Sequence, residues 1–104
     1  MSQLEVRLPH DLDQAEVRRR LDRGLERART EYADQVTAID AAWETDDRLK
    51  VDLKVMGMSI AGDIDVLPAE LVVRLSLPLM VGMFAGRIRS GIEERLGGLL
   101  QAPA

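Results

Sequence analysis

The side chains that could do acid–base chemistry are few in this chain. It has one histidine, His10, and no cysteine. A catalytic histidine needs an orienting carboxylate and a nucleophile or substrate site beside it. The neighbouring Asp11 and Asp13 are better explained as residues at the start of a helix. We therefore expect His10 to have a structural or surface role.

Metal, phosphate and nucleophile motifs are also missing from the sequence. One histidine and scattered carboxylates are too few for a metal site, and Asp46-Asp47 has the character of a turn. The glycines do not have the spacing of a phosphate-binding loop, and no serine lies in a nucleophile motif. The sequence therefore predicts a protein that is not an enzyme and that has no cofactor and no metal.

Length and composition are typical of one soluble domain with an aliphatic core. The chain has 104 residues, of which 46% are hydrophobic and 31% charged, and its aromatic residues are Tyr32, Trp43 and Phe84. Its formal net charge of −4 argues against a nucleic acid partner. The start of the chain has no signal-peptide pattern, and no segment reaches the ~20 apolar residues of a transmembrane helix. We expect a cytoplasmic protein with no transmembrane segment.

Hydrophobic periodicity predicts the first two elements. Apolar and charged residues alternate over residues 4–8, which predicts a strand ended by Pro9. An amphipathic helix should follow to about Asp34, with Asp13 as N-cap and Glu16 reaching back to it. The apolar stripe of this helix consists of Val17, Leu21, Leu25, Ala28 and Tyr32. Its basic run, residues 18–29, is interleaved with acids and is typical of a solvated, ion-paired helix face.

Four further strands should form a meander over residues 36–43, 48–55, 58–66 and 71–77. A two-residue turn at Met56-Gly57 would use the positive φ that glycine allows. The resulting registers place basic residues opposite acidic ones on one face of the sheet. The expected pairs are Lys50 with Asp63, Arg48 with Asp65, and Asp63 with Arg74. We expect this charged face to be exposed to solvent.

The last element should be a helix from about Pro78 to Leu96, ended by Gly97-Gly98. The residues of its apolar face are expected in the core: Met80, Val81, Phe84, Ile88, Ile92 and Leu96. The predicted fold is α+β, an antiparallel meander sheet in the order β-α-β-β-β-β-α with two helices packed on one face. We expect one domain over residues 1–98 and a C-terminal tail over 99–104. The sequence leaves open whether the first strand pairs with the second or the last.

The other side of the last helix has an unusual pattern. A ridge of small residues spaced by four runs along it, with large apolar residues beside it. These residues are Gly82, Gly86 and Ser90, then Leu79 and Met83. One interpretation packs the ridge against Gly24 and Ala28 of the first helix. The other makes the first half of the last helix an apolar surface for a homodimer or a hydrophobic partner. That surface would comprise Leu79, Met80, Gly82, Met83 and Gly86.

Several short motifs, in their order and spacing, resemble a known family. They are Pro9-His10, the helix sequence "EVRRRLDRGL", Trp43, Gly57 and Gly62 in the hairpin, and Leu77-Pro78 before the last helix. In these motifs the chain resembles the small polyhydroxyalkanoic acid system proteins, which bacteria encode near genes for polyester storage granules. The resemblance covers nearly the whole chain. It implies an accessory role at or near polyester inclusions and supplies no catalytic residue.

Two functional hypotheses follow. The first is a non-catalytic accessory protein of the polyester storage system. It would dock to a hydrophobic partner or granule surface, or self-associate, through the apolar N-terminal half of the last helix. The alternative is a binder of an acyl or hydroxyacyl ligand between sheet and helices, similar to small helix-grip folds, with Gly62 leaving a slot. An apolar cavity of a few hundred Å³ would favour this alternative, and a close-packed interior would count against it.

Overall fold

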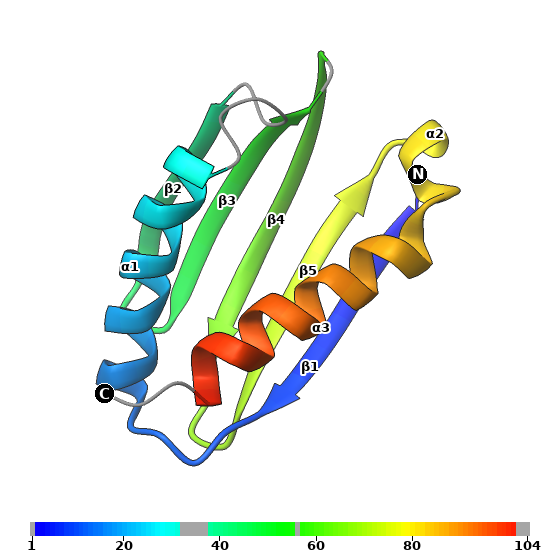
Figure 1. The fold of residues 1–104 in the computed structure, drawn as a ribbon. Coiled ribbons are helices and arrows are strands. Elements are labelled where there is room, and N and C mark those ends of the chain that lie inside the picture. The colour runs from blue at the N-terminus through cyan, green and yellow to red at the C-terminus, as the bar shows by residue number, and fades with distance from the viewer. Residues whose placement is uncertain (1, 32–37, 56, 102–104) are drawn as a thin grey trace.

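The described chain forms a five-stranded sheet and three helices (Figure 1). A computed structural model describes residues 2–31, 38–55 and 57–101. The strands are β1 (Ser2–Pro9), β2 (Ala38–Thr45), β3 (Arg48–Val55), β4 (Met58–Val66) and β5 (Glu70–Leu77). The helices are α1 (Gln14–Glu31), α2 (Leu79–Gly82) and α3 (Ala85–Gln101).

The sheet is antiparallel throughout, in the order β1-β5-β4-β3-β2. The first strand therefore pairs with the last, which answers the question that the sequence left open. The predicted registers are confirmed, because Lys50 lies opposite Asp63 and Asp63 opposite Arg74. Gly57 has a φ of 79°, as expected for the tight turn between β3 and β4. The predicted fold class is confirmed.

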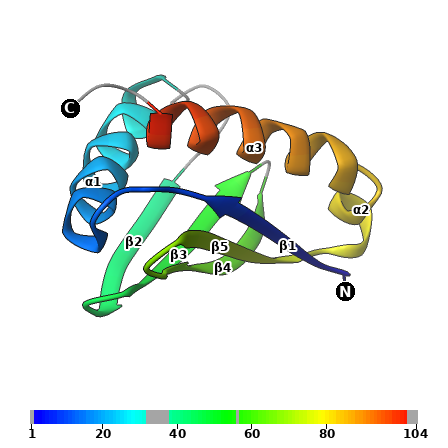
Figure 2. The same ribbon diagram turned by 90° about the horizontal axis from the view of Figure 1, so that it is seen from below.

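Both long helices lie on one face of the sheet (Figure 2), and the side chains of that face are apolar. Alternation with period two turns every second side chain of each strand to this face. The strand residues buried there are Leu4, Val6, Leu8, Leu49, Val51, Ile60, Ile64, Val66, Leu71, Val73, Leu75 and Leu77. Helix α1 adds buried Val17 and Leu21 to the same core, and α3 adds Leu100.

The opposite face of the sheet carries ion pairs between strands. The pairs are Arg74 with Glu5, Asp63 and Asp65, Arg48 with Asp65, Lys50 with Glu44, and Arg7 with Glu70. The Nε atom of Arg48 lies 2.7 Å from an oxygen of Asp65. Exposed ion pairs each contribute little stability. Their effect here is to favour one register over its neighbours, since a shift by one residue would turn these charges to the apolar face.

The last helix differs from its prediction at two points. It is interrupted at Met83 and Phe84, where the Phe84 N–H bonds to the Val81 carbonyl three residues back and tightens the turn. It also continues through Gly97 and Gly98 to Gln101, so the predicted end at Leu96 is wrong. Burial of Leu100 outweighs the cost of two helical glycines, about 1 kcal/mol each. Residues 99–101, predicted as tail, are helical.

Some predictions lie outside the described residues. These are Tyr32 on the stripe of the first helix, the end of that helix near Asp34, the first two residues of the 36–43 strand, and Met56 in the tight turn. Residues 102–104 of the predicted tail are outside them as well.

Candidate apolar ligand site

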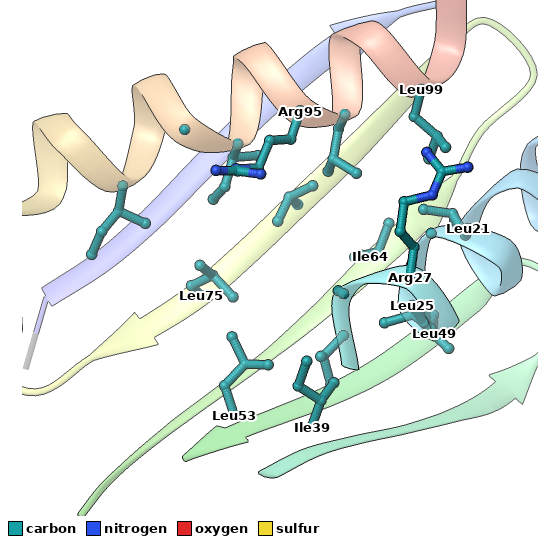
Figure 3. Close-up of a pocket in the computed structure, with 18 of the residues that line it drawn as sticks. Leu21, Leu25, Arg27, Ile39, Leu49, Leu53, Ile64, Leu75, Arg95 and Leu99 are labelled. Atoms are coloured by element: carbon teal, nitrogen blue, oxygen red, sulfur yellow. The ribbon is translucent and has the colours of Figure 1, made fainter. Parts of the chain in front are cut away.

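A cavity of about 540 Å³ lies between the apolar face of the sheet and the helices α1 and α3. Side chains of the sheet form its floor, among them Ile39, Leu49, Leu53, Ile64 and Leu75. Figure 3 shows these side chains pointing into the space between the two helices. The walls are mostly aliphatic side chains of α1 and α3 together with Gly24 and Gly91. The sequence predicted apolar faces on all these elements, but it did not show that the helices leave space between them.

The cavity exists because α1 and α3 meet only at one end. α1 lies over the β2 side of the sheet and α3 over the β1 side, and the helices diverge toward the start of α3 (Figures 1 and 2). They approach where Gly24 faces Leu99, whose methyl carbons would lie 3.7 Å from a Cβ at position 24. The two helices therefore approach closely at this end, which we call the closed end, and a methyl group at position 24 would make an ordinary contact with Leu99 there.

A buried arginine holds the closed end together. Arg20 is 5% exposed, and its Nη1 donates to the carbonyl oxygens of Leu99 at 2.8 Å and Leu100 at 3.3 Å. Its Nε donates to Glu16 at 2.8 Å. Carbonyls in the last turn of a helix have no partner within the helix, and Arg20 satisfies two of them. The prediction of a wholly solvated basic run is wrong at this position. The signal was present, because Arg20 falls between Val17 and Leu21 on the apolar stripe.

Glu16 serves this arrangement rather than the predicted capping box. Its carboxylate accepts hydrogen bonds from Arg19 and Arg20. The bond from Arg20, followed by that from Arg19, lowers the pKa of the Glu16 carboxyl below its ordinary value. The charge of Arg20, buried with the α3 terminus, is thus compensated by an ionised carboxylate.

Three charged residues stand at the rim of the cavity: Arg27, Glu31 and Arg95. All three are exposed, so their charged ends reach solvent. In Figure 3 the Arg27 side chain reaches from α1 toward α3 near Leu99, and Arg95 projects from α3. Within the described part of the chain, the Arg27 guanidinium has no hydrogen bond or ion pair, whereas Arg95 does have a partner. None of the three was singled out by the sequence, since charged residues on helix faces are common.

Trp43 attaches α1 to the edge strand β2. Its indole Nε1 donates a 2.9 Å hydrogen bond to the Asp22 carboxylate. The guanidinium carbon of Arg18 lies 4.8 Å from the centre of the ring, a cation–π distance. This residue of the family motif therefore positions one wall of the cavity.

The remaining motif residues position the backbone. His10 is buried, its Nε2 lies 2.9 Å from the Leu67 carbonyl oxygen, and its Nδ1 accepts the N–H of Leu12 at 3.1 Å. These contacts assign the neutral tautomer with the proton on Nε2. Nε2 thus holds the loop before α1 against the β4–β5 turn, and Nδ1 stabilises that loop internally. At the far end of β5, Leu77 is fully buried and Pro78 is the N-cap of α2.

Gly62 permits a close contact instead of leaving a slot. A Cβ at this position would lie 2.4 Å from the Arg74 carbonyl oxygen and 2.5 Å from a methyl carbon of Leu75. The Leu75 side chain therefore covers Gly62, and Leu75 lines the cavity. The expected space is present, but the divergence of the helices creates it.

Four large apolar side chains are exposed where α2 meets α3, and we call them the α2 cluster. They are Leu79 (75% exposed), Met80 (72%), Met83 (82%) and Phe84 (53%). The core positions predicted for Met80 and Phe84 are wrong, because both side chains are largely exposed. Val81 does pack against the core.

The small-residue ridge does not pack against the first helix. A Cβ at Gly86 would meet no atom of the described residues within 4 Å, whereas Gly24 faces Leu99. Of the predicted apolar surface, Leu79, Met80, Met83 and Gly86 are exposed, and Gly82 is half-buried. That surface is therefore accessible.

Neither a metal centre nor a membrane-spanning helix occurs in the described residues. Among residues 2–31, 38–55 and 57–101, no three histidine or acidic side chains are grouped so that they could hold a metal ion. None of the helices described there has the length and apolar character needed to cross a membrane.

The chain is similar to one known family and to several solved structures. A family model described as "Putative polyhydroxyalkanoic acid system protein (PHA_gran_rgn)" matches residues 4–100. No curated protein matches the chain. Among solved structures, TTHA0849 from Thermus thermophilus is 14% identical over 96% of this chain and 95% of its own, with a TM-score of 0.48. Ara h 8.0201 is 12% identical over 97% and 99%, with a TM-score of 0.42.

Proposed function

The chain belongs to the polyhydroxyalkanoic acid system protein family, and from this premise we propose that it is a non-catalytic binding protein of polyester storage. In this proposal the cavity between the sheet and the helices α1 and α3 takes the acyl chain of a fatty or hydroxyacyl ligand. The family supplies the biological setting, and the cavity supplies the chemistry.

The observation that supports this function is the cavity itself. Its volume of about 540 Å³ lies within the range of small-molecule sites, roughly 300–1,000 Å³. No aromatic ring occurs among the described residues that line it, so a flat ligand would find no stacking partner. Leucine, isoleucine and valine side chains suit a flexible hydrocarbon chain, with charged groups confined to the rim.

In such an apolar site, the binding affinity for a fatty acid should depend on the length of its hydrocarbon chain. Each methylene group moved from water into an apolar site contributes about 0.8 kcal/mol, or about fourfold in affinity. Affinity should therefore rise steadily through a series of saturated fatty acids and level off when the cavity is full. Displacement of the neutral dye Nile red, measured from butanoate to tetradecanoate, tests this directly. Affinity that does not depend on chain length would contradict the proposal.

A matched pair of glycine variants sharpens the test. Gly91 lines the cavity and Gly98 is exposed outside it, both lie in α3, and a Cβ at either position would meet nothing within 4 Å in the described chain. Gly91→Leu should occupy part of the cavity and lower the chain length at which affinity levels off. Gly98→Leu adds the same side chain to the same helix and should leave binding unchanged.

Exposure of the α2 cluster favours a second candidate function. Four large apolar side chains exposed together are unusual in a small protein and often mark a contact site. In this alternative they attach the protein to a granule surface or join two copies as a dimer. Met83→Glu should abolish granule co-sedimentation or self-association without affecting the fold. Ser90→Glu, at an exposed position within α3, should leave both properties unchanged. If both properties survive in Met83→Glu, the cluster is not the docking surface.

A further inference from the structure

We propose that the cavity takes its ligand as a free carboxylate, with the acyl chain inside and the head group bound by Arg27. This inference rests on the proposed acyl-binding function and adds to it the chemical class of the head group. The ligand would then be a fatty or hydroxy acid anion rather than a neutral ester or a segment of polyester.

The position of Arg27 suits this role. It lines the cavity, yet it is exposed, so the aliphatic stem follows the apolar wall while the guanidinium remains in solvent. Figure 3 shows the side chain extending across the space toward α3. A carboxylate at the end of a buried chain would therefore meet the guanidinium at the rim, without entering the apolar interior.

The other arginines of α1 that have described contacts are already engaged. Arg19 and Arg20 bind Glu16, Arg29 binds Glu26, and Arg18 lies over the Trp43 ring. The guanidinium of Arg27 makes no hydrogen bond or ion pair within the described chain. Its planar fork can bind both oxygens of a carboxylate at once.

The charge at the rim is opposite in sign to that of the whole protein. The chain has a formal net charge of −4, whereas the two arginines and one glutamate of the rim leave +1. Arg95 already interacts within the chain, so the assignment rests on Arg27. Glu31 follows Arg27 by one helical turn and would repel an anion. We therefore expect Glu31→Gln to bind fatty acids more tightly, by about twofold.

The decisive measurement compares an acid with its own methyl ester. Dodecanoate and methyl dodecanoate share the acyl chain, and the ester differs in its neutral head group, which carries one additional methyl group at the rim. By displacement of Nile red, the wild-type protein should prefer the acid by about fivefold, the effect of one partly exposed ion pair. Arg27→Gln should remove this preference, because it should lower the affinity for the acid and leave the affinity for the ester unchanged. Arg23→Gln is the control, since Arg23 is exposed on the same helix but does not line the cavity.

The outcomes separate this inference from the function on which it rests. If neither compound binds, the acyl-binding function itself is wrong. If both bind with equal affinity to the wild-type protein, the acyl site stands and the carboxylate assignment is overturned. A preference that survives in Arg27→Gln overturns the assignment to this residue. Arg27 is exposed, so the variant should fold, and an unchanged melting temperature verifies this.

Discussion

Arg20 in α1 donates a 2.8 Å hydrogen bond to the carbonyl oxygen of Leu99 in α3, across most of the length of the chain. This contact joins the two helices that wall the cavity, and it does so at one end only. The separation of the helices elsewhere, and with it the volume of the site, depends on where this contact fixes them.

Replacing Arg20 should destabilise the protein strongly. Arg20→Met keeps the apolar stem but leaves the Leu99 and Leu100 carbonyls without the donor they have now. We expect a loss of about 2–3 kcal/mol in the free energy of unfolding, measured by urea denaturation. Arg19→Met removes an exposed partner of the same Glu16 and should cost less than about 1 kcal/mol. Equal losses for the two variants would show that the α3 carbonyls do not need Arg20.

Gly62 should be intolerant of even a methyl group. The Cβ of an alanine there would lie 2.4 Å from the Arg74 carbonyl oxygen, which is backbone and cannot rotate away. We expect Gly62→Ala to lower the free energy of unfolding by about 1–3 kcal/mol. Gly91→Ala introduces the same methyl group on a helix where it meets nothing, and should stabilise the protein by up to about 1 kcal/mol. If Gly62→Ala left the free energy of unfolding unchanged, the close contact would be disproved.

Stability should fall at acid pH through two carboxyl groups. The hydrogen bond from Arg48, with a further one from Arg74, lowers the pKa of Asp65, and Arg20 lowers that of Glu16. A carboxyl with a lowered pKa in the folded state stabilises the protein above its unfolded pKa. That contribution is lost as the pH falls below roughly 4 and through the folded values. Melting temperatures should decline over this range, and less steeply in Asp65→Asn.

The hydrogen bond between Trp43 and Asp22 should contribute measurably to holding α1 on the sheet. Trp43→Phe keeps an aromatic ring beside Arg18 but removes the N–H donor. We expect a loss of about 1 kcal/mol in thermal or urea unfolding. Asp22→Asn should cost less, because the amide oxygen can still accept the bond. A larger loss in Asp22→Asn than in Trp43→Phe would contradict this account.

The sheet could be predicted from sequence because its determinants are local. Strict alternation defines each strand, and short turns fix the registers, so the residue pattern alone was enough to align Lys50, Asp63 and Arg74. The pairing of β1 could not be predicted in this way, because both edges of the meander offered the same backbone hydrogen bonds. The choice of β5 depends on contacts between segments far apart in sequence.

The helix positions were harder to predict for the same reason. The end of α3 depends on burial of Leu100, which local glycine signals oppose. The cavity depends on where α1 and α3 meet, at Arg20 and Leu99. Periodicity says which face of a helix is apolar without saying how far two helices stand apart. The exposure of Met80 and Phe84 has no clear signal in the sequence, because their spacing is that of the apolar face of a helix.

The pairing of β1 with β5 has a consequence for how the protein is made. During synthesis β1 emerges first, yet its partner strand appears only after more than half of the chain has followed. Hairpins β2–β3, β3–β4 and β4–β5 close over short loops and can form early, whereas β1 must close a long one. Until it does, β5 presents an unpaired edge to other nascent chains. A ribosome pausing between these strands would prolong the interval in which the chain can aggregate.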